Sequence, residues 1–401
     1  MARRATYIKS HSHSGEHVLI LETGDFNGGR GSREKLKSEF ILRSFALLNY
    51  DAITPGERDF LHGVNFLLEM QKQYKLPFVS ANIFYAENNK PVFAPYLIKE
   101  LKKIKHGDTT IPKLTVGIFG VMLYRDQLFL GDGEPNLVVG DPIEAAQQVV
   151  ARIKDKCDIL ICLAHLRYTE LKLFADAVPE VDVFFSGHDP VMRMQPENLN
   201  RAISVVGGNK GQYIGDLRLI IKDKNILDYE GKLTALDEKF SDDPDMLTLI
   251  SEFKDKELTL TYHMNHQQNQ RMDMYSGTET CKKCHESQYN QWQKTGHARA
   301  FQRLLKEKQQ QNYNCLPCHT TGFARFNGFY TYKDTPEMVN IQCEACHGTG
   351  KTHVATAEKM DNKKHSRGML APIVQHTCTN CHTTERDPDF DFKNALEKVK
   401  H

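Results

Sequence analysis

The sequence predicts an α/β domain followed by a mostly α-helical, loop-rich domain. Two observations predict this organisation. Between residues 17 and 235, apolar runs of strand length alternate with longer segments of helical periodicity, an order typical of a buried sheet flanked by helices. Between residues 276 and 401, eight of the ten cysteines recur at one fixed spacing, which indicates cofactor attachment rather than packing.

Composition excludes several classes of protein. Of the 401 residues, 40% are hydrophobic and 26% are charged, which is ordinary for a folded chain and excludes wholesale disorder. Lys plus Arg is 52 and Asp plus Glu is 51, so the net charge of +1 excludes a strongly basic protein that coats nucleic acid. No apolar run reaches the roughly 18 residues of a membrane helix. We therefore expect neither a nucleic-acid partner nor a transmembrane segment.

The elements of the α/β domain are predicted in chain order. Short runs rich in Val, Ile, Leu and Phe predict strands, and apolar residues three and four apart predict helices. Ligands of such sheets bind where strands end in loops. The predicted strands are 17–22, 52–54, 78–84, 114–122, 158–165, 181–186, 203–207 and 213–221, and the predicted helices are 32–49, 59–74, 143–156 and 169–177. Residues 236–275 are predicted as a helical linker, with a helix over 243–258, and residues 1–16 as a flexible N-terminal tail.

The clustered cysteines form four copies of the pattern Cys-x-x-Cys-His, the attachment signature of c-type haem. In such a site both thiols bond to the haem and the adjacent His binds the iron. Zinc ribbons, thioredoxin-like pairs and disulfides are the alternatives, but none of them needs a His after every one of four pairs. We therefore predict four covalently bound haem c groups in residues 276–401, held by Cys281, Cys284 and His285, by Cys315, Cys318 and His319, by Cys343, Cys346 and His347, and by Cys378, Cys381 and His382.

The opposite face of each iron is available to a second ligand, and a second His there is typical of an electron-transfer haem. We predict His297, His353 and His401 as these distal ligands, with His376 and His365 as further candidates. The Gly that precedes His297 is predicted to end a helix and to turn this His away from it.

Three runs in this region, SGTETCKKCHESQYNQWQKTGHARAF, CEACHGTGKTH and CTNCHTTERDPDFDF, resemble the cytochrome c554 family of multihaem cytochromes. The resemblance covers about residues 275–401. It implies haems packed in close pairs, between which electrons move, and it supports distal roles for His297 and His353. One haem in that family can be five-coordinate.

The loops after the predicted strands resemble those of the calcineurin-like metallophosphoesterases, close to the 5′-nucleotidase branch, over residues 17–235. The resemblance implies a sandwich of two sheets flanked by helices, with a metal pair that activates water and holds phosphoryl oxygens. Asp25 stands at the bridging Asp, His165 at a lone His and His188 at the first His of the last motif. The residues that carry the resemblance are Gly24-Asp25, Gly56-Glu57-Arg58-Asp59, His165 and Gly187-His188-Asp189-Pro190.

The match to that ligand set is partial. Glu57 replaces a ligand Asn, Arg58 replaces the His that supports the leaving group, and Pro190 replaces the final ligand. The opening Asp-x-His motif has no counterpart. We therefore expect a degenerate site that holds one divalent metal ion at most, through Asp25, Glu57, His165 and His188, and we expect no ordinary phosphoesterase turnover. The alternative is an inherited scaffold whose polar loops satisfy one another.

The N-terminal segment is basic but lacks the apolar stretch of a secretory signal. Because c-type haem is attached outside the cytoplasm, we expect a periplasmic or extracellular protein, with outer-membrane association open, whose natural chain extends upstream. Fusions of a 5′-nucleotidase-like domain to a multihaem cytochrome are known as UshA-like (seleno)proteins. The chain is similar to the ExtKL type of these multihaem proteins without its N-terminal segment.

These features predict a secreted tetrahaem c-type cytochrome that carries electrons in anaerobic or extracellular respiration. Its expected partners are other cytochromes or electron-conduit proteins, and its expected acceptors are metal ions or selenium and tellurium oxyanions. Whether it would be a terminal reductase or a carrier stays open. Two alternatives are a metal-dependent phosphoesterase with a haem redox-sensing domain and a non-catalytic docking subunit of a cytochrome conduit.

Overall fold

The computed structural model describes residues 1–12, 16–106, 109–128, 134–189, 192–268, 274–325, 327–359 and 373–401. The chain folds as two compact units, Met1–Ile250 and Ser251–His401. The helix α6 (Pro244–Gln268) crosses this boundary, within the segment expected to be a helical linker. Its first turn is capped because the Asp243 carboxylate accepts the N–H of Met246 at 3.0 Å. Among the described residues, no helix is both long and apolar enough to span a bilayer.

The first residues of the chain are helical, so the expectation of a flexible tail over residues 1–16 is wrong for residues 2–12. Helix α1 (Ala2–Ser12) buries Ala5, Tyr7 and Ile8, and Ala5 has no exposed surface. Its polar side is also held, because the Lys9 ammonium lies 2.7 Å from a carboxylate oxygen of Asp243. The helix was missed because its buried face is short and its charges find their partners more than 200 residues away in the sequence.

We expect Ile8→Ala to lower the free energy of unfolding by about 2–4 kcal/mol, because the buried side chain would leave a cavity under α1. Chemical denaturation of the full chain measures this change. Ser10→Ala, on the exposed side of the same helix, should shift it by less than about 0.5 kcal/mol. Equal, small effects of both changes would show that α1 does not pack on the unit.

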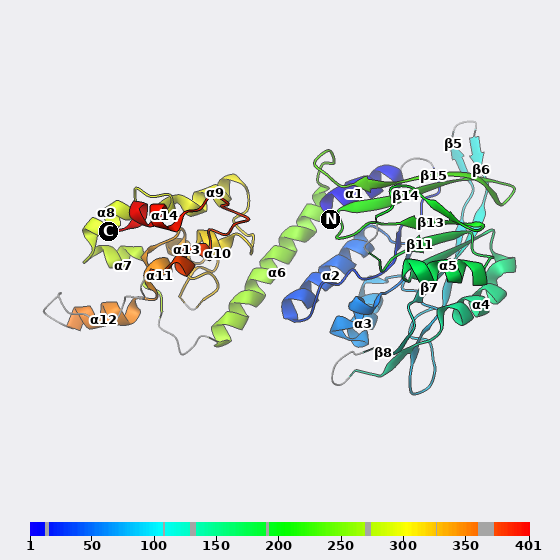
Figure 1. The fold of residues 1–401 in the computed structure, drawn as a ribbon, viewed down its shortest axis with the longest axis horizontal. Helices are drawn as coiled ribbons and strands as arrows, with labels where there is room; N and C mark the ends of the chain where they lie inside the picture. The colour runs from blue at the N-terminus through cyan, green and yellow to red at the C-terminus, as the bar shows by residue number, and fades with distance from the viewer. Residues whose placement is uncertain are drawn as a thin grey trace. The chain divides into compact units, whose positions relative to one another are not determined.

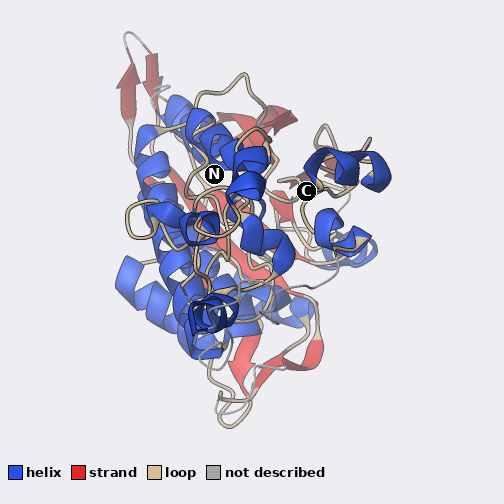
Figure 2. Ribbon diagram, turned by 90° about the vertical axis from the view of Figure 1, so that its left-hand side faces the viewer, coloured by secondary structure: helices blue, strands red, loops and turns tan. Residues whose placement is uncertain are grey.

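All strands among the described residues belong to the first unit (Figures 1 and 2). The predicted strand over 114–122 is confirmed residue for residue as β7. The predicted strands 52–54, 158–165, 181–186, 203–207 and 213–221 agree within two residues, whereas 17–22 and 78–84 overlap only the short strands 21–22 and 83–85, and the strand 225–235 was not predicted. The strands are β1 (Leu21–Glu22), β2 (Ala52–Ile53), β3 (Ile83–Tyr85), β4 (Tyr96–Leu101), β5 (Ile104–His106), β6 (Thr109–Ile111), β7 (Leu114–Met122), β8 (Arg125–Leu128), β9 (Leu137–Val139), β10 (Ile159–His165), β11 (Val183–Ser186), β12 (Glu197–Leu199), β13 (Ala202–Val206), β14 (Tyr213–Lys222) and β15 (Asn225–Ala235).

The main sheet has a parallel centre. Its strand order is β12-β13-β11-β10-β7-β4, in which β13, β11, β10 and β7 are parallel and the two edge strands are antiparallel. Strands β1 and β2 pair in parallel, and β14 and β15 form an antiparallel hairpin. Because parallel strands end at the same edge, the loops that follow β1, β2, β10 and β11 are candidates to meet.

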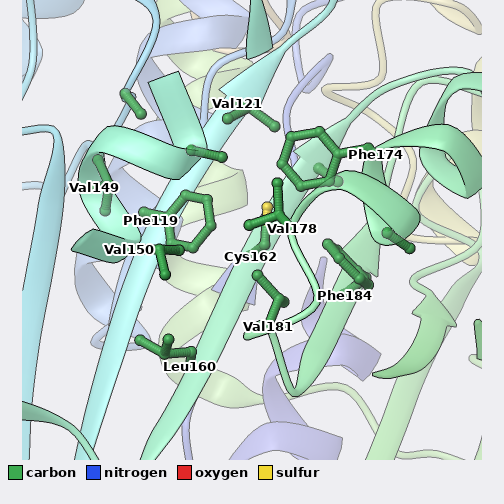
Figure 3. Packing of buried hydrophobic residues seen from close by; sticks show 14 of the residues in the cluster. Phe119, Val121, Val149, Val150, Leu160, Cys162, Phe174, Val178, Val181 and Phe184 are labelled. Carbon is green, nitrogen blue, oxygen red and sulfur yellow. The ribbon is translucent and has the colours of Figure 1, made fainter. Parts of the chain in front are cut away.

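Helices cover one face of the main sheet and the β14–β15 hairpin packs on the other. On the helical face, Phe119 of β7 and Cys162 of β10 pack with Phe174 and Phe184, all of them almost fully buried (Figure 3). On the opposite face, Ile161 packs in a cluster that includes side chains of the hairpin. The alternation along the strands places successive side chains in the two layers. The helices of this unit are α2 (Ser32–Leu47), η1 (Glu57–His62), α3 (Val64–Tyr74), α4 (Pro142–Ile153), η2 (Lys154–Lys156) and α5 (Tyr168–Ala177).

The second unit is built from short helices and loops, and no strand occurs among its described residues. Its buried core is small and consists of Leu258, Phe301, Leu304, Leu316, Phe329 and Met338. The helices after α6 are α7 (Thr278–Lys282), α8 (Glu286–Trp292), η3 (His297–Arg299), α9 (Ala300–Lys306), α10 (Leu316–His319), η4 (Pro336–Met338), α11 (Cys343–His347), α12 (Lys351–Lys359), α13 (Gln375–Thr379) and α14 (Phe392–Val399).

Candidate functional site

The structure brings together the four residues that the sequence offered as metal ligands. Asp25 follows β1, Glu57 follows β2, His165 ends β10 and His188 follows β11. Their ligand atoms all lie within 4.8 Å of one another. The cluster therefore sits where parallel strands end, as expected for a ligand site in an α/β domain. Two carboxylates and two imidazoles form a donor set that suits a divalent transition metal.

The cluster is held by hydrogen bonds between its own members. The Nε2 atom of His165 lies 2.9 Å from Oε2 of Glu57 and 3.7 Å from Oδ1 of Asp25. The Nδ1 atom of His188 lies 3.3 Å from Oε1 of Glu57 and 3.2 Å from Nε2 of His165. These four side chains thus converge on one small volume, in which a cation would replace the contacts between them.

His165 is oriented by the main chain. Its side chain is fully buried, and its Nδ1 atom lies 2.7 Å from the carbonyl oxygen of Thr23. Because a carbonyl accepts only, Nδ1 carries the proton and Nε2 faces the cluster, as in metal-binding histidines. Burial lowers the pKa of His165, but the hydrogen bond to Glu57 and the Asp25 carboxylate raise it above its usual value.

The two histidines of the cluster act on the pKa of Glu57. Partial burial raises its pKa, but the hydrogen bonds from His165 and His188 lower it well below its usual range. The carboxylate thus stays ionised beside two imidazoles, which favours a bound cation over a bound proton.

Two glycines let the ligand loops approach each other. Gly24 has φ +90°, and a Cβ atom there would lie 2.3 Å from the backbone nitrogen of Gly56. A Cβ atom on Gly56 would lie 2.5 Å both from Oδ1 of Asp25 and from Cε1 of His165. The volume between the ligands therefore exists only because residue 56 has no side chain. Asp25 and His188 also adopt left-handed backbone conformations, with φ of 58° and 72°, which are uncommon for residues other than glycine.

Asp59 connects the loop of Asp25 to the loop of Glu57 through hydrogen bonds. The sequence does not indicate this role: it shows only a carboxylate three residues after Gly56. Its Oδ2 atom accepts the N–H of Gly56 and of Asp25, each at 2.8 Å, and its Oδ1 atom accepts the N–H of Asn27 at 3.0 Å. The side chain is fully buried. Burial and the neighbouring Asp25 carboxylate raise the pKa of Asp59, and the main-chain N–H groups lower it. The net result is a raised pKa of about 8.

We expect Asp59→Asn to weaken metal binding about 10- to 100-fold, the usual cost of losing a group that orients metal ligands. The amide would place its NH₂ group against a main-chain N–H, and the unsatisfied contact should lower the unfolding free energy by about 1–3 kcal/mol. Calorimetric titration with Mn²⁺ and chemical denaturation measure the two effects.

Asp141→Asn is the matched control, because Asp141 also accepts main-chain N–H groups, those of Ile143 and Glu144, but does so as the N-cap of α4. Asn is as good an N-cap as Asp, so this variant should match the wild type. If both variants bound metal equally well, Asp59 would have no part in positioning the ligands.

Arg58 lies beside the cluster, and Pro190 lies outside the described residues. The main-chain N–H of Arg58 donates to Oδ1 of Asp25 at 3.0 Å, and its Nη2 atom donates to the carbonyl oxygen of Gly28 at 2.7 Å. The side chain is exposed. The guanidinium is therefore fixed on the loop that also carries Asp25.

In the second unit, three of the expected distal histidines each face a histidine of a Cys-x-x-Cys-His motif. The ring centres are 6.2 Å apart for His285 and His353, 6.2 Å for His297 and His382, and 5.5 Å for His347 and His401. The remaining motif histidine is His319, of the second motif. Its Nδ1 atom instead lies 2.6 Å from the carbonyl oxygen of Ala300.

His376 lies on α13, immediately before the fourth motif, and among the described residues no ring faces it. His365 lies outside the described residues. The structure thus pairs three of the predicted distal ligands with motif histidines and leaves His376 unpaired.

Thiols of different motifs also meet. Cys281 of the first motif contacts Cys343 of the third, and Cys318 of the second contacts Cys381 of the fourth. The first pair is held in place by Glu344, which is buried and accepts the N–H groups of Ser276, Gly277 and Gly350. The first and third motifs are therefore neighbours, as are the second and fourth.

Comparison with known proteins assigns the fold of the first unit. Solved structures that match include the 5′-nucleotidase precursor from Thermus thermophilus, with a TM-score of 0.54 and 20% identity over 69% of this chain and 55% of that one. A calcineurin-like phosphoesterase from Bacillus subtilis matches with a TM-score of 0.53 and 22% identity over 65% of this chain and 90% of that one. The first unit has the calcineurin-like phosphoesterase fold.

Sequence relatives name particular enzymes. The 5′-nucleotidase of Bos taurus is 27% identical over 281 residues, which are 64% of this chain and 47% of that protein. The 2′,3′-cyclic-nucleotide 2′-phosphodiesterase/3′-nucleotidase of Haemophilus influenzae is 29% identical over 190 residues, 44% of this chain and 28% of that protein. The chain thus spans half or less of the length of these relatives.

The second unit matches the family model of cytochrome c554 and c-prime over residues 280–348. The match spans the first three Cys-x-x-Cys-His motifs and ends before the fourth, which begins at Cys378. It supports a cytochrome-like unit, and the number of haems stays a prediction.

These comparisons correct two expectations drawn from the sequence. The leading function, a secreted respiratory electron carrier, is contradicted because the relatives found over most of the first unit are nucleotidases and phosphodiesterases. The expectation that phosphoesterase turnover is absent is contradicted by the same relatives. The first expectation rested on the Cys-x-x-Cys-His motifs of the second unit. The second gave too much weight to the missing Asp-x-His motif and too little to the four ligands that remain together.

Proposed function

We propose that this protein is a metal-dependent phosphoesterase whose second unit is a haem-bearing redox sensor. The observation that carries the proposal is the convergence of Asp25, Glu57, His165 and His188 within 4.8 Å at the carboxyl ends of parallel strands. The 5′-nucleotidases and phosphodiesterases among its relatives support phosphate esters as the substrate class.

The residues present fit one divalent cation. The donor set holds two negative charges and two neutral nitrogen donors, and the space between the ligands would be filled by a Cβ atom on Gly56. Bound there, such a cation would supply Lewis acidity and a water molecule that is more readily deprotonated. The chain's own residues do the rest: Thr23 fixes the tautomer of His165, and Asp59 holds the Asp25 and Glu57 loops in register.

Turnover of p-nitrophenyl phosphate tests this function. The purified full chain, stripped with a chelator, should be inactive, and Mn²⁺ or Zn²⁺ should restore hydrolysis in proportion to the bound metal. Asp25→Asn should lose this activity, whereas Asp141→Asn should keep it. Activity that survives chelation, or that Asp25→Asn leaves unchanged, would show that the cluster is not the catalytic centre.

For the second unit we propose covalently bound haem c at the four motifs. Two imidazoles that share one metal ion, each bound at about 2 Å, would have ring centres roughly 6 Å apart. The three histidine pairs, at 6.2, 6.2 and 5.5 Å, are close to this spacing. The pairs that would each hold one haem iron are therefore His285 with His353, His382 with His297, and His347 with His401.

Two further observations support the haems. The Nδ1 atom of His353 is buried without a hydrogen-bond partner, as expected of a ring positioned for another bond. The apolar core is small for a unit that extends from residue 251 to 401, so the unit needs another source of buried contact. Haem would supply a redox-active iron and a large apolar surface.

The haem proposal also implies a cellular location for the protein. Because c-type haem is attached outside the cytoplasm, we propose a periplasmic or extracellular location. The redox sensor would exchange electrons with another cytochrome or electron-conduit protein, and the oxidation state of the haems would then report on the supply of electrons.

A further inference from the structure

Both the main chain and the side chain of Arg58 are held by hydrogen bonds on the loops beside the ligand cluster. The main-chain N–H of Arg58 donates to Oδ1 of Asp25 at 3.0 Å, so residue 58 begins at the cluster. The guanidinium donates to the carbonyl oxygen of Gly28 at 2.7 Å, on the same loop that carries Asp25. One of its five N–H groups is thus used for position, and the exposed side chain leaves the others available to a ligand.

The charges of the cluster define what Arg58 can do. Asp25 and Glu57 bring two carboxylates to the cluster, whose negative charges a divalent cation would neutralise, while His165 and His188 would bind it as neutral donors. A phosphoryl group brings up to two further negative charges to the same place. The guanidinium is always protonated and its planar fork matches a phosphoryl group, so it can offset part of this charge.

The same permanence of charge limits the chemistry. A guanidinium does not release its proton at ordinary pH, so Arg58 cannot act as a general acid. The four ligand side chains would be occupied by the cation, and Asp59 is fully buried with both oxygens accepting main-chain N–H groups. None of these residues is placed to protonate a departing oxygen.

On the basis of the proposed phosphoesterase function, we propose that Arg58 binds the phosphoryl oxygens and restricts the site to substrates whose leaving oxygen departs as an anion, namely phosphoanhydrides and aryl phosphates rather than alkyl phosphates. Water attacks phosphorus and forms the new P–O bond. The old P–O bond breaks, and its electron pair leaves with the phenolate or phosphate. The proton released from the water passes to solvent. No oxidant or reductant takes part.

The test measures kcat/KM of the metal-loaded full chain for aryl phosphates of graded leaving-group acidity and for phenethyl phosphate as the alkyl ester. Wild type should show a steep dependence on leaving-group acidity and little turnover of the alkyl ester. Arg58→Gln should lower kcat/KM for every aryl phosphate by about 10- to 100-fold, mostly through KM, because one charge-assisted contact to the phosphoryl group is lost.

Arg58→His separates phosphoryl binding from proton transfer. An imidazole titrates near neutral pH and can protonate a leaving oxygen, so this variant should show a weaker dependence on leaving-group acidity and a larger share of alkyl ester turnover. Metal affinity, measured by calorimetric titration with Mn²⁺, should stay within about twofold of wild type in both variants. Arg152→Gln is the control. Arg152 is exposed and lies near the end of α4, just before the start of β10, whereas the ligand His165 lies at the other end of β10.

Each result has one meaning. If no phosphate ester is hydrolysed with any metal, the proposed function itself fails. If hydrolysis occurs but Arg58→Gln matches Arg152→Gln, or wild type turns over the alkyl and aryl esters equally, the role of Arg58 is refuted while the phosphoesterase stands. A loss of metal affinity in Arg58→Gln equal to its loss of activity would also refute it, because Arg58 would then only support Asp25.

Discussion

Glu57→Gln should reduce metal affinity and metal-dependent hydrolysis by more than 100-fold. Glu57 is the residue on which both histidines of the cluster converge, at 2.9 Å from His165 and 3.3 Å from His188. The amide keeps the size of the side chain but removes one of the two negative charges that offset a divalent cation. Loss of a group that merely orients a ligand costs about 10- to 100-fold, and loss of a charged ligand should exceed it.

The measurement is calorimetric titration of the stripped protein with Mn²⁺ and Zn²⁺, alongside hydrolysis of p-nitrophenyl phosphate. Glu144→Gln supplies the same chemical change at an exposed position in the first turn of α4 and should leave both values unchanged. The folded state should tolerate Glu57→Gln, because the carboxylate is partly exposed. Wild-type metal affinity in Glu57→Gln would remove Glu57 from the ligand set.

The second unit should fail to fold stably when the chain is made without haem. Among its described residues, one small hydrophobic cluster of six buried side chains forms the core, and its Cys-x-x-Cys-His motifs lie on short helices that bury little apolar surface of their own. Chains with too small a core depend on a cofactor or crosslink for stability. Trypsin should therefore degrade residues 251–401 of the haem-free chain and leave a resistant fragment that ends near residue 250.

The matched sample is the same chain from a host that attaches c-type haem. It should be coloured, should gain the mass of four haems and should resist trypsin over its full length. A reductive titration should show low-spin spectra for the three haems with paired histidines. Equal resistance of both units in the haem-free chain would contradict the dependence on haem, and a colourless protein of unchanged mass from the competent host would contradict haem attachment itself.

The α/β unit was largely predictable because its signal is local. The continuous apolar runs that became β7 and β10 are buried on both faces of a parallel sheet, where every position must be apolar. Strands such as β5 and β12 have three residues each and mixed composition, so no periodicity marks them. Helix α1 was not predicted for a different reason. Its stability depends on partners such as Asp243, which come near Lys9 only in the folded chain.

The ligand cluster was predictable from a resemblance and not from spacing, since its four members extend from residue 25 to residue 188. No sequence pattern indicated the groups that position these four ligands. Asp59 binds three main-chain N–H groups, and Thr23 acts through its carbonyl oxygen, so neither role depends on a side-chain motif that can be read in one dimension. The same holds for Glu344, which lies between two haem-motif cysteines and acts on main-chain atoms of distant segments.

The close approach at Gly56 offers a practical route to the natural substrate. With φ of −96°, the backbone there accommodates alanine, yet the added methyl group would press on Asp25 and His165. Gly56→Ala should thus be a folded but inactive blank. In extracts treated with either wild type or this blank, any metabolite consumed only by the wild type would identify a genuine substrate, without a prior guess at its structure.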